Sequence, residues 1–157
     1  MKLKKVFALV LVAISAFSLA ACSSSAPAAD GGKSGAVQPA SPFQPCDTLD
    51  AAEQLAGFTL ALPKAADGLE AIENELIQAF YGRNGSDMLI RKALGSGDIS
   101  GDYNEYAQVD TVDGVTLKGG DGRFSLALWT DGDYTYSIRV GTALSQADMM
   151  ALVNGVK

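Results

Sequence analysis

The sequence predicts an α+β domain, a curved antiparallel sheet of about six strands with a short N-terminal helix and a C-terminal amphipathic helix packed on it. Short segments of alternating apolar residues follow one another and are joined by turns such as Asn84-Gly85 and Asp113-Gly114, and short connections indicate antiparallel pairing. Helical spacing of apolar residues occurs over 48–56 and 145–157, at the two ends of this region. Helices packed on one face of such a sheet define the α+β class.

The first helix and the first strand are predicted by local signals. Asp47 or Thr48 can cap a helix over residues 48–56, and Gly57 ends it. Apolar residues then alternate over residues 58–62, which predicts a strand.

Residues 69–81 fit two patterns. Their apolar residues nearly match a helix, but residues 75–82 also suit a strand that is buried on both faces. The Asn84-Gly85 turn that follows favours the second interpretation. We therefore predict a hairpin that pairs residues 75–82 with residues 87–94.

Two more strands are expected at residues 106–112 and 115–119, and a further hairpin within residues 123–140. A loop of residues 130–132 would pair Leu128 with Tyr134 and bring six apolar side chains to one face, whereas a two-residue Asp131-Gly132 loop would mix the faces. Because register follows the buried face, we expect the three-residue loop.

This register has a consequence for Trp129, which it places on the other face of the sheet together with Arg139. The final helix is then expected to cover the sheet, since Ser145 and Asp148 form a capping box at its start. Its apolar stripe consists of Met149, Leu152, Val153 and Val156.

The chain opens with features of an export signal: a basic start, an apolar run and small residues before Cys22. Leu19-Ala20-Ala21-Cys22 resembles the lipobox of bacterial lipoproteins, in which the thiol carries diacylglycerol and the chain is cut just before the Cys. The resemblance implies that residues 1–21 are a signal peptide and that membrane lipid holds the protein through Cys22, lipid-anchored on the outer, extracytoplasmic face of the cell membrane. The alternative is an ordinary secretory signal that contains a Cys.

Residues 22–45 are rich in Ser, Ala, Gly and Pro, which predicts a flexible tether after the lipidated Cys. A single domain is expected over residues 46–157. Cleavage would leave nine of the 12 basic residues against 18 acidic ones. Nucleic acid is therefore excluded as a partner, because its binding depends on basic patches.

Several segments of the domain are similar to the DUF4367 family. They are "LAGFTLALP", "ELIQAFYG", "IRKALGSGDISGDYNEY", "LALWTDGDYTYSI" and "LSQADMMALVNGV", and together they span about residues 47–157. The resemblance implies an exported or membrane-anchored domain and supports the strand interpretation of residues 75–82. No catalytic pattern accompanies these segments, and association of some relatives with anti-sigma or sporulation proteins suggests envelope sensing by analogy.

The sequence offers few candidates for catalytic residues. The chain contains no His, so the commonest general base and most zinc sites are lost. Cys46 is the only other thiol, and no His or Lys adjoins it. We expect no cofactor.

A calcium site is the main metal hypothesis, and its candidate ligands are Asp98, Asp102 and Glu105. The loop that begins at Asp98 has Tyr103 where an EF-hand requires Gly, and Val109 where it requires Glu. A solvated connection whose side chains bond their own backbone is therefore favoured over a metal site.

Arg91, Trp129 and Arg139 are the candidates for a partner-contact surface, because exposed aromatic residues beside Arg are typical of interfaces. The alternative is a purely structural Trp that seals the sheet edge.

The function these observations favour is a non-catalytic envelope lipoprotein domain that binds or senses an unknown envelope protein or ligand. A calcium-dependent or carboxylate-based envelope enzyme and a structural envelope component are the alternatives.

Overall fold

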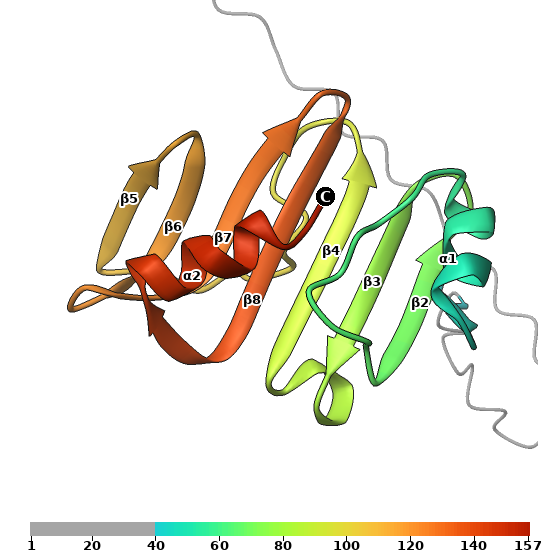
Figure 1. Cartoon of the computed structure of the whole chain (residues 1–157), viewed down its shortest axis with the longest axis horizontal. Helices are drawn as coiled ribbons and strands as arrows, with labels where there is room; N and C mark the ends of the chain where they lie inside the picture. The colour runs from blue at the N-terminus through green and yellow to red at the C-terminus, as the bar shows by residue number, and fades with distance from the viewer. Residues whose placement is uncertain (1–39) are drawn as a thin grey trace, which may run out of the picture. The chain divides into compact units, whose positions relative to one another are not determined.

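The structure is a computed structural model that describes residues 40–157, which form one open antiparallel sheet and two α-helices (Figure 1). The expected α+β class is confirmed, but the sheet has eight strands where about six were expected. Among residues 40–157 there is no helix of the length and hydropathy needed to cross a bilayer. The elements are β1 (Gln44–Cys46), α1 (Leu49–Ala56), β2 (Gly68–Ile72), β3 (Leu76–Tyr81), the 3-10 helix η1 (Arg83–Gly85), β4 (Met88–Leu94), β5 (Gln108–Val112), β6 (Val115–Gly120), β7 (Arg123–Asp131), β8 (Tyr134–Ser145) and α2 (Gln146–Asn154).

The sheet consists of two antiparallel meanders. Strands β1 to β4 pair in sequence order, strands β5 to β8 do the same, and the strand order across the sheet is β1-β2-β3-β4-β8-β7-β6-β5. The β4–β8 pair joins the two meanders. Residues 95–107 therefore have to carry the chain from the middle of the sheet to its far edge.

The two helices begin where their caps predict. Thr48 accepts a hydrogen bond from the main-chain N–H of Ala51 at the start of α1, and Gly57 ends the helix with a φ of 80°. Ser145 caps α2 by accepting from the N–H of Asp148 at 3.2 Å. Because these signals are local, the sequence located both helices to within one residue at their starts.

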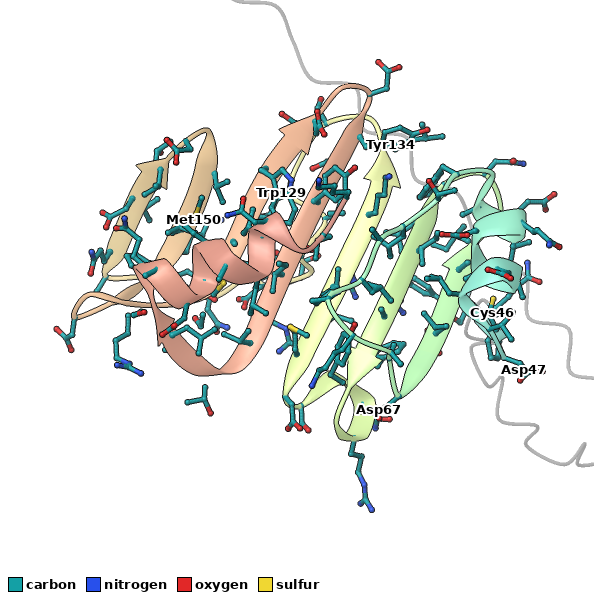
Figure 2. All side chains as sticks on the ribbon, viewed as in Figure 1. Cys46, Asp47, Asp67, Trp129, Tyr134 and Met150 are labelled. Atoms are coloured by element: carbon teal, nitrogen blue, oxygen red, sulfur yellow. The ribbon has the colours of Figure 1, made fainter. Side chains whose placement is uncertain are left out.

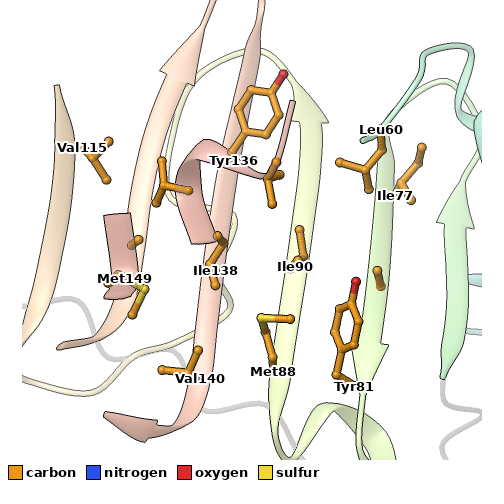
Figure 3. Close-up of a cluster of buried hydrophobic side chains, with 14 of the residues drawn as sticks. Leu60, Ile77, Tyr81, Met88, Ile90, Val115, Tyr136, Ile138, Val140 and Met149 are labelled. Atoms are coloured by element: carbon orange, nitrogen blue, oxygen red, sulfur yellow. The ribbon is translucent and has the colours of Figure 1, made fainter. Parts of the chain in front are cut away.

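Both helices pack on the same face of the sheet, which we call the helix-covered face. Its strand residues form one apolar core with both helices. Figure 3 shows part of this core, including Met149 of α2. Burying one large apolar side chain contributes about 1.5–3 kcal/mol, whereas the one salt bridge among residues 40–157, Lys118–Asp98, is partly exposed and contributes little. The core therefore stabilises the domain. Its most buried large members include Leu60, Ile77, Tyr81, Ile90, Leu117, Phe124, Ile138 and Met149.

Residues 58–62, which were expected to be a strand, belong to no strand of the sheet, so that prediction was wrong. This crossing segment runs over the helix-covered face, in front of β3 and β4 (Figure 1). Its main chain is held by the carboxylate of Glu53, which accepts from the N–H of Leu60 at 2.7 Å, and by Lys157, whose carbonyl accepts from Ala61 at 2.8 Å. Apolar alternation therefore marked an extended segment correctly, but its neighbours are a helix and the C-terminus.

The first meander has two strands that the sequence did not predict. β1 begins at Gln44, so the sheet starts two residues before the boundary expected at Cys46. β2 pairs with β3 and occupies residues that also fit a helical pattern. The predicted hairpin of residues 75–82 with 87–94 is found as β3 and β4, with η1 between them.

The register of the β7–β8 hairpin differs from the expectation. Asp131 pairs with Tyr134, so the loop is Gly132-Asp133, and Trp129 pairs with Tyr136. A bulge between Phe124 and Leu126 then moves Phe124 onto the helix-covered face while Leu126 stays on the other one. The expectation was wrong because it assumed one buried face, and Leu126 is fully buried on the second.

Candidate functional site

The face of the sheet opposite the helices is covered in part by residues 95–107, and we call it the loop-covered face. Two of its strand side chains bind the main chain of this connection. Arg91 donates to the carbonyl of Ile99 at 2.9 Å, and the hydroxyl of Thr135 donates to the carbonyl of Gly97 at 3.0 Å. The loop is therefore fixed to β4 and β8.

A row of polar side chains crosses the loop-covered face on β2, β3 and β4. Glu70 pairs with Gln78 and Gln78 with Arg91 in the strand register. The amide of Gln78 donates to Glu70 at 2.6 Å, and its oxygen accepts from the guanidinium of Arg91 at 2.9 Å. Gln78 is only 4 % exposed, so this row satisfies a polar group that would otherwise be costly to bury.

Arg91 and Arg139 lie close enough on this face to affect each other. Burial lowers the pKa of Arg91, and the charge of Arg139 lowers it further. Arg139 is exposed whereas Arg91 is engaged by Gln78 and Ile99. Only Arg139 of this pair therefore has its side chain open to a partner.

Asp98 accepts hydrogen bonds both from its own loop and from strand β6. Its carboxylate accepts from the N–H and the hydroxyl of Ser100 and from the ammonium of Lys118 at 3.0 Å. Burial alone would raise the pKa of Asp98, but these hydrogen bonds and the Lys118 charge outweigh it and the pKa is lowered.

Asp102 is used in the same way. It accepts from the main-chain N–H of Asn104 at 2.9 Å, from the Asn104 amide at 2.7 Å and from the hydroxyl of Tyr106 at 2.7 Å. Burial opposes ionisation here too, yet the hydrogen bonds and the charge of Arg139 lower the pKa of Asp102. Both carboxylates are therefore held as anions inside the loop.

The calcium candidates Asp98, Asp102 and Glu105 are not brought together. Over residues 40–157, no three acidic, Cys or His side chains group as metal ligands would. Asp98 faces Lys118, Asp102 faces Tyr106, and Glu105 is exposed. The alternative of a connection whose side chains bond their own backbone describes these contacts.

The three residues predicted to share a contact surface are divided between the two faces. Arg91 and Arg139 lie on the loop-covered face, but Trp129 lies on the helix-covered face (labelled in Figure 2). Trp129 stacks on Tyr136, with ring centroids 5.0 Å apart and the rings 5° from parallel. The separation follows from the register, because each residue of slip moves a side chain to the opposite face. Trp129 therefore contributes to packing, but it does so on the inner strand β7 and not at the sheet edge, where the alternative interpretation placed it.

Lys92 is a polar residue whose burial the sequence analysis did not predict. It lies on the helix-covered face, is 5 % exposed, and donates to the carbonyl of Thr59 at 2.7 Å. Its ammonium is 4.4 Å from the ring centroid of Tyr134, 5.1 Å from that of Tyr136 and 5.6 Å from that of Phe58. The signal was present, since Lys92 continues the alternation of Met88 and Ile90 on β4.

Two hollows adjoin the turn between β3 and β4. The larger, of about 760 Å³, lies beside β1, β2 and η1, and its polar side chains are Asp67, Glu70, Arg83 and Asn84. The smaller, of about 420 Å³, includes Tyr81, whose hydroxyl donates to the carbonyl of Lys64 at 2.8 Å. Burial, followed by the charge of Asp67, raises the pKa of Tyr81 to about 12, so its hydroxyl stays protonated.

Exposed large apolar residues mark a different part of the domain. Leu94, Tyr103 and Val109 are 48 %, 97 % and 58 % exposed. Tyr103 precedes β5 and Val109 belongs to it.

The predicted signal peptide and lipidation site, residues 1–21 and Cys22, lie outside the described residues.

A scan against models of known families finds no match to this chain, and searches of curated proteins and of solved structures find no significant similarity. The resemblance to the DUF4367 family therefore stays a prediction.

Proposed function

We propose that this chain is an extracytoplasmic lipoprotein, anchored to the cell membrane through Cys22, whose domain binds or senses an envelope component without catalysing a reaction. The observation that carries the proposal is the segment Leu19-Ala20-Ala21-Cys22 after a basic start and an apolar run. Two acyl chains on one Cys give stable anchoring where a single chain would be marginal. The partner itself is an envelope protein or ligand.

The absence of catalysis is supported by how the charged groups of the loop-covered face are used. Asp98 and Asp102 have lowered pKa values, so they remain ionised at neutral pH and cannot act as general acids. Arg91 is bound on two sides by Gln78 and Ile99. The charged side chains of this face therefore stabilise the loop and are not free to act as catalytic groups.

The contact surface we propose differs from the one expected from sequence. The proposed surface no longer includes Trp129. It consists of Tyr103, which is exposed before β5, Val109, which is exposed within β5, and Arg139, which is also exposed. Exposed Tyr and Arg side chains are the residue types that interfaces favour. Arg91 is assigned instead to holding the loop.

The anchoring is tested by metabolic labelling with palmitate and by fractionation of cells that express the full chain. Wild type is expected to carry the label and to sediment with membranes, and Cys22→Ala is expected to lose both properties. Cys46→Ala is the matched control, since Cys46 is the other cysteine of the chain. Label that persists in Cys22→Ala and disappears in Cys46→Ala would refute the proposal.

The binding surface is tested by a pull-down from envelope extracts with wild type, Tyr103→Ala and Glu73→Gln, an exposed change in the β2–β3 turn. We expect Tyr103→Ala to lose partners that the other two proteins recover. Equal recovery by all three would remove Tyr103 from the surface.

A further inference from the structure

The sheet is open, so it has two edge strands, and they are not equally able to pair with another chain. β1 has three residues, and the central one is Pro45, which has no N–H to donate. β5 has five residues and contains no proline. Within residues 40–157 no strand pairs with the outer side of β5.

The hairpin geometry shows which groups of β5 point outward. Asp113 and Gly114 have φ values of 49° and 81°, as in a type I′ turn, and Val112 pairs with Val115 across it. The residues that flank such a turn form a hydrogen-bonded pair, and bonded and non-bonded pairs then alternate along the ladder. The N–H and C=O groups of Val109 and Thr111 therefore point away from β6.

Charge distinguishes the partners that this edge can take. Residues 105–122 contain four acidic side chains and a single basic one, Lys118, which is paired with Asp98. An approaching strand with basic side chains would be attracted, whereas a second copy of β5 would bring the same acids against each other. The four acids are Glu105, Asp110, Asp113 and Asp121.

We propose that the outer edge of β5 binds an extended basic peptide segment of a partner protein, which adds to the sheet as a ninth strand. The main chain of Val109 and Thr111 supplies the hydrogen bonds, and the surrounding carboxylates select lysine and arginine side chains. The inference rests on the proposed binding function and names the chemistry of the partner.

The test uses the full chain, purified in detergent, and a short synthetic peptide in which Lys alternates with Val. We expect the fluorescently labelled peptide to bind, and amide hydrogen exchange of residues 107–112 to slow by about tenfold or more. The control peptide has Glu in place of each Lys and is expected not to bind.

Two variants separate the backbone from the charges. Thr111→Pro removes an outward N–H and leaves the β6 ladder intact, because edge strands tolerate proline where the N–H faces solvent. It is expected to abolish the protection of residues 107–112. Glu105→Gln combined with Asp110→Asn and Asp113→Asn keeps the strand and is expected to weaken peptide binding about tenfold, whereas the matched control Asp47→Asn, Glu73→Gln and Glu75→Gln is expected not to.

The outcomes that overturn the inference are distinct. They are peptide binding without protection of β5, equal binding of the Glu peptide, unchanged protection in a folded Thr111→Pro variant, and protection of β5 without peptide that rises with protein concentration, which would assign the edge to a second copy. Anchoring through Cys22 is measured independently by palmitate labelling. Failure at β5 is therefore distinguishable from failure of the proposed function.

Discussion

The ammonium of Lys92 donates a hydrogen bond to the carbonyl oxygen of Thr59 across a distance of 2.7 Å, and this contact ties the crossing segment to the middle of the sheet. A buried ammonium loses its hydration, which costs several kcal/mol. The rings of Phe58, Tyr134 and Tyr136 surround it and return part of that cost through cation–π attraction. The charge is thus compensated by aromatic faces and one carbonyl.

Replacing Lys92 distinguishes packing from charge. Lys92→Ala is expected to lower the free energy of unfolding by about 3 kcal/mol, because it leaves a cavity beneath the crossing segment. Lys92→Met fills the space without a buried charge and is expected to cost less than about 1 kcal/mol. Urea denaturation measures both, and equal losses in the two variants would show that the ammonium contacts dominate.

Trp129 is expected to act through stability. Trp129→Ala removes the ring stacked on Tyr136 and should lower the free energy of unfolding by about 2–3 kcal/mol. This loss is somewhat smaller than that expected for truncating a fully buried Trp, because Trp129 is only partly buried. Trp129→Phe keeps an aromatic ring and should lose about half as much. Thermal melts provide the measurement. A Trp129→Ala protein that is fully stable but loses its partner would contradict the assignment to the core.

The loop carboxylates predict how stability depends on pH. A carboxylate whose folded pKa is lowered stabilises the fold above its unfolded pKa of about 4, and this contribution disappears as the pH falls through the lower folded value. Asp102→Asn is therefore expected to reduce stability at pH 7, with a difference from wild type that vanishes in strong acid. Glu105→Gln, an exposed carboxylate of the same loop, is the control. Urea denaturation from pH 7 to strong acid measures the difference in free energy of unfolding between wild type and Asp102→Asn. A difference that stays constant over this range would contradict the prediction.

Calcium is expected to leave the melting temperature unchanged. The oxygens of Asp98 and Asp102 already accept hydrogen bonds from Ser100, Lys118, Asn104 and Tyr106. Melts with millimolar calcium and with EDTA should coincide. A rise in melting temperature with calcium that Asp98→Asn abolishes would instead establish a metal site in this loop.

The sequence predicted best what depends on neighbouring residues. Thr48 and Ser145 locate the starts of both helices because a cap acts within one turn. The turn at Asp113-Gly114 likewise defines β5 and β6. These signals need no knowledge of the rest of the chain.

What the sequence could not predict depends on what covers each face. Leu126 is buried beneath the loop-covered face, so the apolar residues of β7 did not have to share one side, and a bulge at Ser125 placed Phe124 on the other. The position of Trp129, and with it the predicted contact surface, followed the wrong register. Burial on both faces removes the asymmetry from which register is inferred.

The division of the sheet into two meanders has a consequence for how the chain folds. Within each meander, strands that pair are neighbours in the sequence, and apart from the β1–β2 pair, which encloses α1, their ladders close short loops at small entropic cost. The β4–β8 ladder joins Met88 to Val140 and closes the longest loop between paired strands. We expect this ladder to form late, after the two meanders exist. We also expect the buried Ile90–Ile138 pair, next to the centre of the ladder, to control the rate at which the meanders dock.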